Sequence, residues 1–320
     1  MHRALALYSG GLDSLLSIIL IKEQNIDVIG IKFLTGFVYP LKEEDFNYAK
    51  TFGFKIMEYD LREKFISLLK KPNHGFGKNL NPCIDCKILM LQESKRLLDE
   101  LKASFVVTGE VVSQRPMSQK KPLLLHIDKK ASLTGFVVRP LSAKILPVTK
   151  PEEQGILSRE LFFDFWGRTR KPQLMLAQKY GIKKIPQPSG GCLLTDPLFC
   201  KKLKDLIVHE QLSVENVELL KIGKHFRISE TCKAIVGRDE QENEVLFNNF
   251  EGPFIYPLDL KGPVILMRGE CSKDEIDIGA SLCVYYSKKD NNTVVIKNKD
   301  REERKNYNAI SNEEIVKYRI

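Results

Sequence analysis

Residues 4–14 read Ala-Leu-Ala-Leu-Tyr-Ser-Gly-Gly-Leu-Asp-Ser, and this stretch decides the fold of the first part of the chain. Its apolar beginning is typical of a short buried strand. Gly10 and Gly11 allow a tight turn, and the apolar residues of 15–20 predict a helix that begins near Asp13. Such a turn brings unpaired backbone N–H groups and the positive end of the helix dipole to one point. The stretch therefore predicts an anion site.

The polar side chains of this turn suit a polyphosphate. Ser9 and Ser14 can each donate a hydroxyl hydrogen to it. Asp13 would repel a phosphate, so we expect it to hold Mg²⁺ between its carboxylate and the ligand. In the alternative interpretation, Asp13 only stabilises the start of a helix. The string lacks the Gly-Lys-Ser/Thr of a Walker loop and the spaced glycines of a dinucleotide site, so it indicates a phosphate site of another kind.

Strand-like and helical patterns alternate along the next part of the chain. Strand-like runs occupy 28–33, 56–59, 105–110 and 137–141, and helical patterns occupy 43–52 and 61–69. This alternation predicts an α/β fold with a doubly wound parallel sheet. Ligands of such sheets bind at the carboxyl ends of the strands, which is where Ser9 to Ser14 lie.

Beyond about residue 200 the pattern changes, and we expect a second, smaller α+β domain. Residues 203–220 are helical in pattern, and strand-like runs follow at 234–236, 264–267, 282–286 and 293–296. We therefore divide the chain into domains 1–200 and 201–320. The aromatic group at 162–166 is expected to be core.

Composition limits the partners and the compartment. Fifty Lys and Arg against 41 Asp and Glu leave a net charge of +9, which suits a polyanionic partner. No apolar stretch is long enough to span a bilayer, and no signal-peptide core follows Met1. We therefore expect a cytoplasmic protein with no membrane partner. The oligomeric state is open, with a homodimer as the default because dimers are the commonest closed assembly.

The seven cysteines divide into two groups. An odd number in a cytoplasmic chain argues against a disulfide framework. Cys83 and Cys86 have the spacing that lets two thiolates meet on one metal or on each other. The pair alone leaves open a zinc site, a redox dithiol or an iron–sulfur site. With no second pair of this spacing, a four-cysteine zinc site is disfavoured.

Cys192, on a glycine-rich loop, supplies a third candidate thiolate. Three thiolates would leave one iron of a [4Fe–4S] cluster open to an exogenous sulfide, as catalytic zinc sites keep one position free. The alternative for Cys192 is a small apolar residue in a turn. For the other four we prefer that alternative, because a free cysteine packs as a small hydrophobe; they are Cys200, Cys232, Cys271 and Cys283.

Together, Ser9 to Ser14, the pair Cys83/Cys86 and Cys192 resemble the PP-loop ATP pyrophosphatases of the tRNA thiouridine synthase group, in its iron–sulfur-dependent branch. The strings at 109–119 and 189–196 resemble the same branch. The strings at 223–227 and 236–243 are similar to the NFACT-R RNA-binding module. The resemblance implies a PP-loop (adenine nucleotide alpha hydrolase-like) catalytic domain at 1–200 and an RNA-binding domain at 201–320.

The resemblance also implies roles for individual residues. ATP phosphates and Mg²⁺ would be bound by Ser9, Gly10, Gly11, Asp13 and Ser14. Gly109 would line the nucleotide pocket, and the cluster would be held by Cys83, Cys86 and Cys192, with its fourth iron carrying the transferred sulfur. Candidates for stabilising phosphate charge are Lys87, Arg115, Arg139 and Lys144. Basic residues expected to help to capture RNA are Arg168, Arg170, Lys171, Lys201 and Lys202.

The implied reaction is ATP-dependent tRNA thiolation. A uridine carbonyl oxygen is adenylated and then replaced by sulfur from free sulfide or a sulfur carrier. Three alternatives stay open: a persulfide-based thiouridylase without a cluster, a PP-loop ligase or amidase acting on a small molecule with a structural metal, and a non-enzymatic RNA-binding protein. The sequence leaves the target uridine, the ring position and the sulfur donor open.

Overall fold

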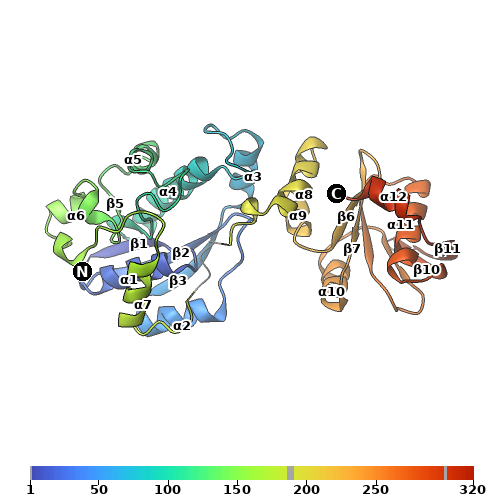
Figure 1. The fold of residues 1–320 in the computed structure, drawn as a ribbon, viewed down its shortest axis with the longest axis horizontal. Helices are drawn as coiled ribbons and strands as arrows, with labels where there is room; N and C mark the ends of the chain where they lie inside the picture. Colours follow the sequence, from blue (N-terminus) through green and yellow to red (C-terminus); the bar gives the residue numbers. More distant parts are fainter. Residues whose placement is uncertain (1, 186–190, 299–300) are drawn as a thin grey trace. The chain divides into compact units, whose positions relative to one another are not determined.

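The computed structural model describes residues 2–185, 191–298 and 301–320. The chain forms two compact units, Met1–Asp196 and Pro197–Ile320 (Figure 1). Each unit has its own sheet and its own hydrophobic core. The two units are described separately below.

The first unit is built on a five-stranded parallel sheet in the order β3-β2-β1-β4-β5. Its strands are β1 (Arg3–Leu7), β2 (Asp27–Leu34), β3 (Lys55–Asp60), β4 (Phe105–Thr108) and β5 (Val137–Val138). The predicted doubly wound α/β fold is confirmed. The chain order reverses between β1 and β4, so the carboxyl ends of these two strands form the switch point at which ligands of such sheets bind.

Helices cover both faces of this sheet (Figure 1). They are α1 (Leu12–Lys22), α2 (Glu43–Phe52), α3 (Arg62–Lys70), α4 (Cys83–Glu100), α5 (Lys121–Lys130), α6 (Lys150–Glu153) and α7 (Lys171–Lys179), with 3₁₀ turns at η1 (Ala143–Ile145), η2 (Arg159–Leu161) and η3 (Leu193–Thr195). Side chains of a strand alternate between faces. In β1, Ala4 and Ala6 pack in the cluster that contains α1, whereas Leu5 packs with Leu97 of α4.

The second unit has a six-stranded antiparallel sheet in the order β11-β10-β8-β9-β7-β6. Its strands are β6 (Lys224–Arg227), β7 (Cys232–Val236), β8 (Phe254–Pro257), β9 (Ile265–Gly269), β10 (Asn291–Asn298) and β11 (Arg301–Asn308). Its helices are α8 (Pro197–Val208), α9 (Val214–Leu219), α10 (Glu240–Asn249), α11 (Lys273–Tyr286) and α12 (Asn312–Tyr318). This α+β architecture matches the expectation.

Two expectations about local structure are wrong. Residues 282–286, predicted as a strand, form the last turns of α11. Ser272 and Glu275 make a capping box that starts this helix, and the apolar run then continues inside it. Trp166, expected in the core, is 67% exposed, although Phe162 of the same group is buried.

The cysteine expectations also change. Cys232 and Cys271 form a disulfide, so the preference for two free cysteines was wrong. The odd number of cysteines was a poor argument against disulfides, because it does not prevent two of the cysteines from pairing. Cys200 and Cys283 lie outside the disulfide and are buried, as small hydrophobes are. Within the described residues, no helix is long and apolar enough to cross a membrane.

Candidate functional site

The loop after β1 presents the amino end of α1 at the switch point. Gly10 has a φ of +78°, a left-handed conformation that favours glycine. Gly11 is the N-cap residue of α1, and no side chain caps this end of the helix. The hydroxyls of Ser9 and Ser14 lie 3.2 Å apart, and Ser14 Oγ donates to the Gly11 carbonyl at 2.8 Å. Backbone donors and two hydroxyls therefore converge, as an anion site requires.

Gly109 follows β4 and lies against the first turn of α1. A Cβ at this position would stand 2.4 Å from the Ser14 nitrogen and 2.5 Å from the carbonyl carbon of Asp13. Any side chain would push the two segments apart. Gly109 therefore sets how closely the end of β4 approaches the phosphate-binding turn.

The carboxylate of Asp13 is largely buried, and only one of its two oxygens accepts a hydrogen bond among the described residues. Its Oδ2 accepts a hydrogen bond from Gln114 Nε2 at 2.9 Å, while its Oδ1 is buried and has no hydrogen-bond partner among the described residues. Burial raises the pKa of the carboxyl, and Gln114, Arg170 and Arg115 oppose that rise. Gln173 also lowers this pKa, although neither of its amide atoms makes a hydrogen bond of normal geometry. A desolvated carboxylate with a free oxygen fits the ligand chemistry of Mg²⁺.

Lys32 is a candidate site residue that the sequence analysis missed. It is buried in β2, and a Cβ on Gly10 would lie 3.5 Å from its Nζ. Burial lowers its pKa, while the carboxylates of Asp45 and Glu58 oppose that change. A lysine inside an otherwise apolar strand was the available signal. Its charge lies below the glycine turn, where it favours a bound anion.

Contacts far apart in the sequence bring the three candidate cysteines toward one another. Cys83 and Cys86 lie in the first turn of α4. Cys192 directly precedes η3, which is held by a hydrogen bond from Leu193 N to Phe37 O (2.9 Å) and by one from Asn79 Nδ2 to Thr195 O (3.0 Å). All three thiols are half-buried.

Electrostatic coupling shows that these thiols are neighbours. Burial, together with the thiols of Cys192 and Cys83, raises the pKa of Cys86 to about 12, although Lys87 opposes the rise. Thiolate donors suit iron or zinc. However, the described residues contain no group of three or more His, Cys, Asp and Glu side chains already arranged around a metal position. The donor types fit a metal cluster, but a finished ligand set is not formed. Ser189 and Gly190 of the glycine-rich string lie outside the described residues.

Arg139 differs from its expected role at the nucleotide. It is buried, and its guanidinium donates to Glu110 Oε2 at 3.0 Å and to both oxygens of Asp128 at 2.7 and 2.8 Å. Lys87 Nζ lies 3.0 Å from the other oxygen of Glu110. Arg139 is therefore engaged inside the protein, and it stabilises the segment after β4. Arg115, by contrast, is exposed and acts on Asp13.

The C-terminal part of the chain matches a known protein family. Residues 223–319 match the family described as NFACT protein RNA binding domain. The matched range covers the sheet of the second unit from β6 to β11, together with α10, α11 and α12.

Curated relatives are tRNA-specific 2-thiouridylases MnmA. That of Amoebophilus asiaticus is 27% identical over 50% of this chain and 49% of its own length. That of Salinibacter ruber is 24% identical over 64% of this chain and 56% of its own length. The chain thus spans about half the length of the curated relatives it matches.

Among solved structures, the chain is similar to a 4-thiouridine synthetase–RNA complex with bound ATP, with 16% identity and a TM-score of 0.35, over 57% of this chain and 52% of that one. A likeness this distant carries no argument here. The relatives and the family match confirm the resemblance read from the motifs: the chain is similar to tRNA thiouridine synthases and carries a segment that matches the NFACT RNA-binding domain.

Proposed function

We propose that this protein is an ATP-dependent tRNA sulfurtransferase that adenylates a uridine carbonyl oxygen and replaces it with sulfur. One chain of contacts carries the proposal. Lys87, next to Cys86, pairs with Glu110, and Gly109, next to Glu110, lies against Asp13 and Ser14. The thiols and the anion site therefore lie at the same edge of the sheet. A reaction that uses both ATP and a sulfur-carrying thiol needs the two groups close together.

In the proposed reaction, the first unit, Met1–Asp196, forms the catalytic domain. Backbone N–H groups of the turn Ser9-Gly10-Gly11, with the Ser14 hydroxyl, would bind the ATP phosphates. Asp13 would hold Mg²⁺ through its unpartnered Oδ1, and a bound Mg²⁺ neutralises charge that develops on the departing pyrophosphate. Lys32 and Arg115 would add positive charge around the same group.

For sulfur delivery we propose Cys83, Cys86 and Cys192 as the ligands of a [4Fe–4S] cluster. Three protein thiolates leave one iron open, and such a cluster can carry a sulfide at that iron. The closeness of the three thiols supports this assignment. The second route is a persulfide on one of these cysteines, formed when its thiolate takes sulfane sulfur from a persulfide-bearing carrier and the thiolate of the carrier leaves.

The proposed partners follow from the second unit and the surface charge. Residues 201–320 would bind tRNA, supported by the family match at 223–319 and by the net charge of +9. Free sulfide or a sulfur carrier would supply sulfur, and the assembly would be a homodimer. We place the protein in the cytoplasm with its tRNA.

An ATP–pyrophosphate exchange assay tests the adenylation step. We expect exchange that depends on tRNA and is lost in Asp13→Asn but kept in Asp99→Asn, whose side chain is exposed on α4. Exchange driven by a small metabolite without tRNA would instead support a PP-loop ligase. No exchange under any condition would support an RNA-binding protein without catalysis.

Metal analysis of protein purified without oxygen tests sulfur delivery. We expect about four irons and matching acid-labile sulfide per chain. The alanine variants of Cys83, Cys86 and Cys192 should each lose them, whereas Cys200→Ala in α8 should not. Zinc alone, or no metal with thiolation retained, would remove the cluster and leave the persulfide route.

A further inference from the structure

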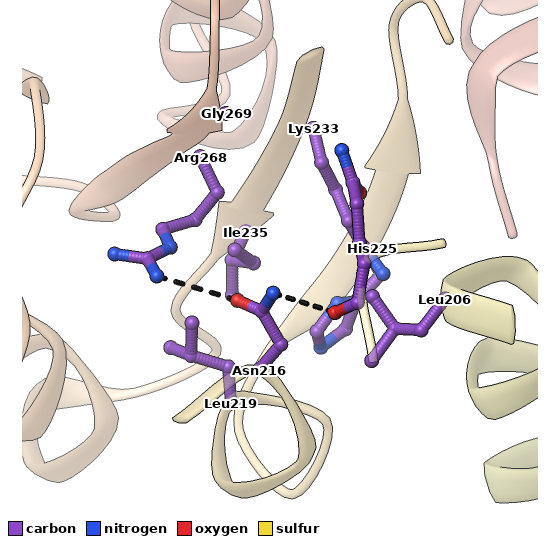
Figure 2. A pocket seen from close by; sticks show the side chains of 9 residues that line it. Leu206, Asn216, Leu219, His225, Lys233, Ile235, Arg268 and Gly269 are labelled. Carbon is purple, nitrogen blue, oxygen red and sulfur yellow. Dashed lines mark hydrogen bonds between the residues drawn. The ribbon is translucent and has the colours of Figure 1, made fainter. Parts of the chain in front are cut away.

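The second unit contains a cavity of about 150 Å³ that the proposed reaction does not use. Figure 2 shows it between α8, α9 and the strands β6, β7 and β9. Leu206, Leu219 and Ile235 form apolar walls and are all buried. A cavity of about this volume accommodates one six-membered ring, as an engineered cavity of similar size accommodates benzene.

Strand register brings the polar lining to one face of the sheet. His225 pairs with Ile235, and Lys233 pairs with Arg268. Directly paired residues share a face, and so do residues two apart on one strand. His225, Ile235, Lys233 and Arg268 therefore all face the same side, and all four line the cavity (Figure 2).

His225 offers an unused acceptor in this cavity. The residue is only 2% exposed, and its Nε2 lies 2.8 Å from the Ile222 carbonyl oxygen. A carbonyl oxygen only accepts, so Nε2 must carry the ring proton and Nδ1 must present a lone pair. Nδ1 is buried and makes no hydrogen bond to any residue that the structure describes. Burial, with the nearby charges of Lys233 and Lys202, lowers the pKa of His225 well below 6.5, so the ring is neutral.

Lys233 offers donors to the same space. It is 3% exposed, and its Nζ makes one ion pair, at 3.0 Å, with Asp205 Oδ2. An ammonium has three N–H donors, so donors remain for a carbonyl oxygen of a ligand. Arg268 is occupied by Glu215 at 2.8 Å and by Asn216 at 3.3 Å, and it closes one side of the cavity (Figure 2).

These groups disfavour a fully deprotonated anion. A deprotonated phosphate or carboxylate only accepts hydrogen bonds, so it would place lone pairs against the lone pair of His225 Nδ1. Lys233 and Arg268 already have carboxylate partners, which lowers the attraction for a further anion. The cavity instead needs a small flat ring that bears an N–H next to a carbonyl group.

We propose that this cavity binds a uracil base of the RNA partner. The ring N3–H would donate to His225 Nδ1, an adjacent carbonyl would accept from Lys233, and the apolar walls would enclose the ring faces. Cytosine has no N–H at the equivalent ring nitrogen, so it would leave two acceptors facing each other. The inference takes RNA as the source of the base from the proposed function, but it needs neither ATP nor sulfur transfer.

NMR of the full chain with ¹⁵N-labelled histidine tests this inference. The chain has five histidines, and His225→Gln identifies the relevant signal. We expect uridine to shift the Nδ1 resonance of His225 and to bind at least about 10-fold more tightly than cytidine or 3-methyluridine, which lacks the ring N–H. Equal binding of the three nucleosides, or no shift at millimolar uridine, overturns the proposal; the latter indicates a cavity filled by water.

A pair of variants on α8 tests the location without removing a polar group. Leu206→Phe places a larger side chain in the cavity, whereas Val208→Phe adds the same side chain at an exposed position of the same helix. Uridine binding should be lost only in Leu206→Phe, while far-UV circular dichroism should show that both variants remain folded. Uridine binding retained in Leu206→Phe contradicts the proposed location. If exchange is absent from the unmodified chain but uridine still binds, the reaction is wrong and the base pocket stands.

Discussion

Lys87 Nζ and Glu110 Oε1 lie 3.0 Å apart, and this ion pair joins the helix that carries Cys86 to the segment that follows β4. Glu110 also accepts from Arg139 at 3.0 Å and from Thr108 Oγ1 at 3.0 Å. One buried carboxylate thus links two parts of the candidate site. Its loss should affect stability and site geometry together.

We expect Glu110→Gln to destabilise the protein by about 3–5 kcal/mol at neutral pH, because it leaves buried cations unpaired. Burial alone would raise the pKa of Glu110, but Lys87 and Arg139 lower it from 4.5 to about 2. A lowered carboxyl pKa stabilises the fold above the unfolded value of 4.5, and that contribution is lost as the pH falls toward 2. Urea unfolding should therefore show a difference between the two proteins that shrinks as the pH falls below 4.5.

The surface pair Arg96–Glu100 provides the control for this measurement. Its atoms are 3.2 Å apart and both side chains are at least half exposed. Glu100→Gln should cost less than about 1 kcal/mol. Equal costs for the two substitutions would show that the Glu110 network contributes no more than a surface pair.

Asp13→Asn should separate stability from activity. Burial raises the pKa of Asp13, so its charged form is disfavoured in the folded state. Removing that charge should leave the free energy of unfolding unchanged or higher, because the raised pKa reflects a cost of folding at neutral pH. ATP–pyrophosphate exchange should fall to background. A variant that unfolds, or one that keeps its exchange activity, contradicts the assigned role.

Gly109→Ala should displace the first turn of α1. The added methyl would stand 2.4 Å from the Ser14 nitrogen, and backbone cannot rotate away as a side chain can. We expect a loss of about 1–3 kcal/mol and weaker ATP binding, measured by thermal unfolding and calorimetry. Gly30→Ala in β2 is the matched control, since its methyl would meet ordinary contacts of 3.4–3.5 Å. A larger effect at Gly30 would contradict the close-approach argument.

Trp166→Ala should weaken tRNA binding. Trp166 is 67% exposed and forms an isolated bridge with Val112, which follows β4 near the nucleotide site. Stacking of a base on an exposed aromatic ring contributes about 1–3 kcal/mol, so the affinity should fall by about 5- to 150-fold. Leu161→Ala, also on the surface, serves as the control in a filter-binding assay. An unchanged tRNA affinity would remove Trp166 from the interface.

Replacing both Cys232 and Cys271 by Ala should destabilise the second unit. The disulfide closes a loop with a sequence separation of 39 residues. Loop closure of this size contributes about 2–4 kcal/mol, chiefly by limiting the unfolded chain. Reductant should lower the free energy of unfolding of the parent chain by this amount. It should leave the free energy of unfolding of the double variant unchanged. A reductant-sensitive double variant would point to another thiol.

Local sequence was sufficient for the phosphate-binding turn and the sheet that carries it. The features of residues 4–14 are local: an apolar strand, glycines that permit a φ of +78°, and a helix start without a side-chain cap. Strand–helix alternation then leaves few topologies, because parallel strands need crossover connections. This is why the fold class and the positions of Ser9, Asp13 and Ser14 at a strand end could be predicted.

Long-range packing decided what the sequence could not. Leu282 to Tyr286 has the composition of a strand, but as the end of α11 it is helical and packs in the core of the second unit. Arg139 follows a strand, as a phosphate-binding residue often does, yet Asp128 and Glu110 fold next to it and occupy its donors. Burial and pairing depend on residues distant in the chain, and local patterns do not encode them.

By itself, then, the sequence determined the chemistry available: a glycine turn for an anion, thiols at the spacing of a metal or sulfur site, and a basic chain. Only the tertiary structure decided which groups meet. It paired Lys87 with Glu110, joined Cys232 to Cys271, and left Asp13 Oδ1 and His225 Nδ1 without hydrogen-bond partners in the described part of the chain. The physical reason is that desolvation and hydrogen bonding act between atoms close in space, and folding alone sets those distances.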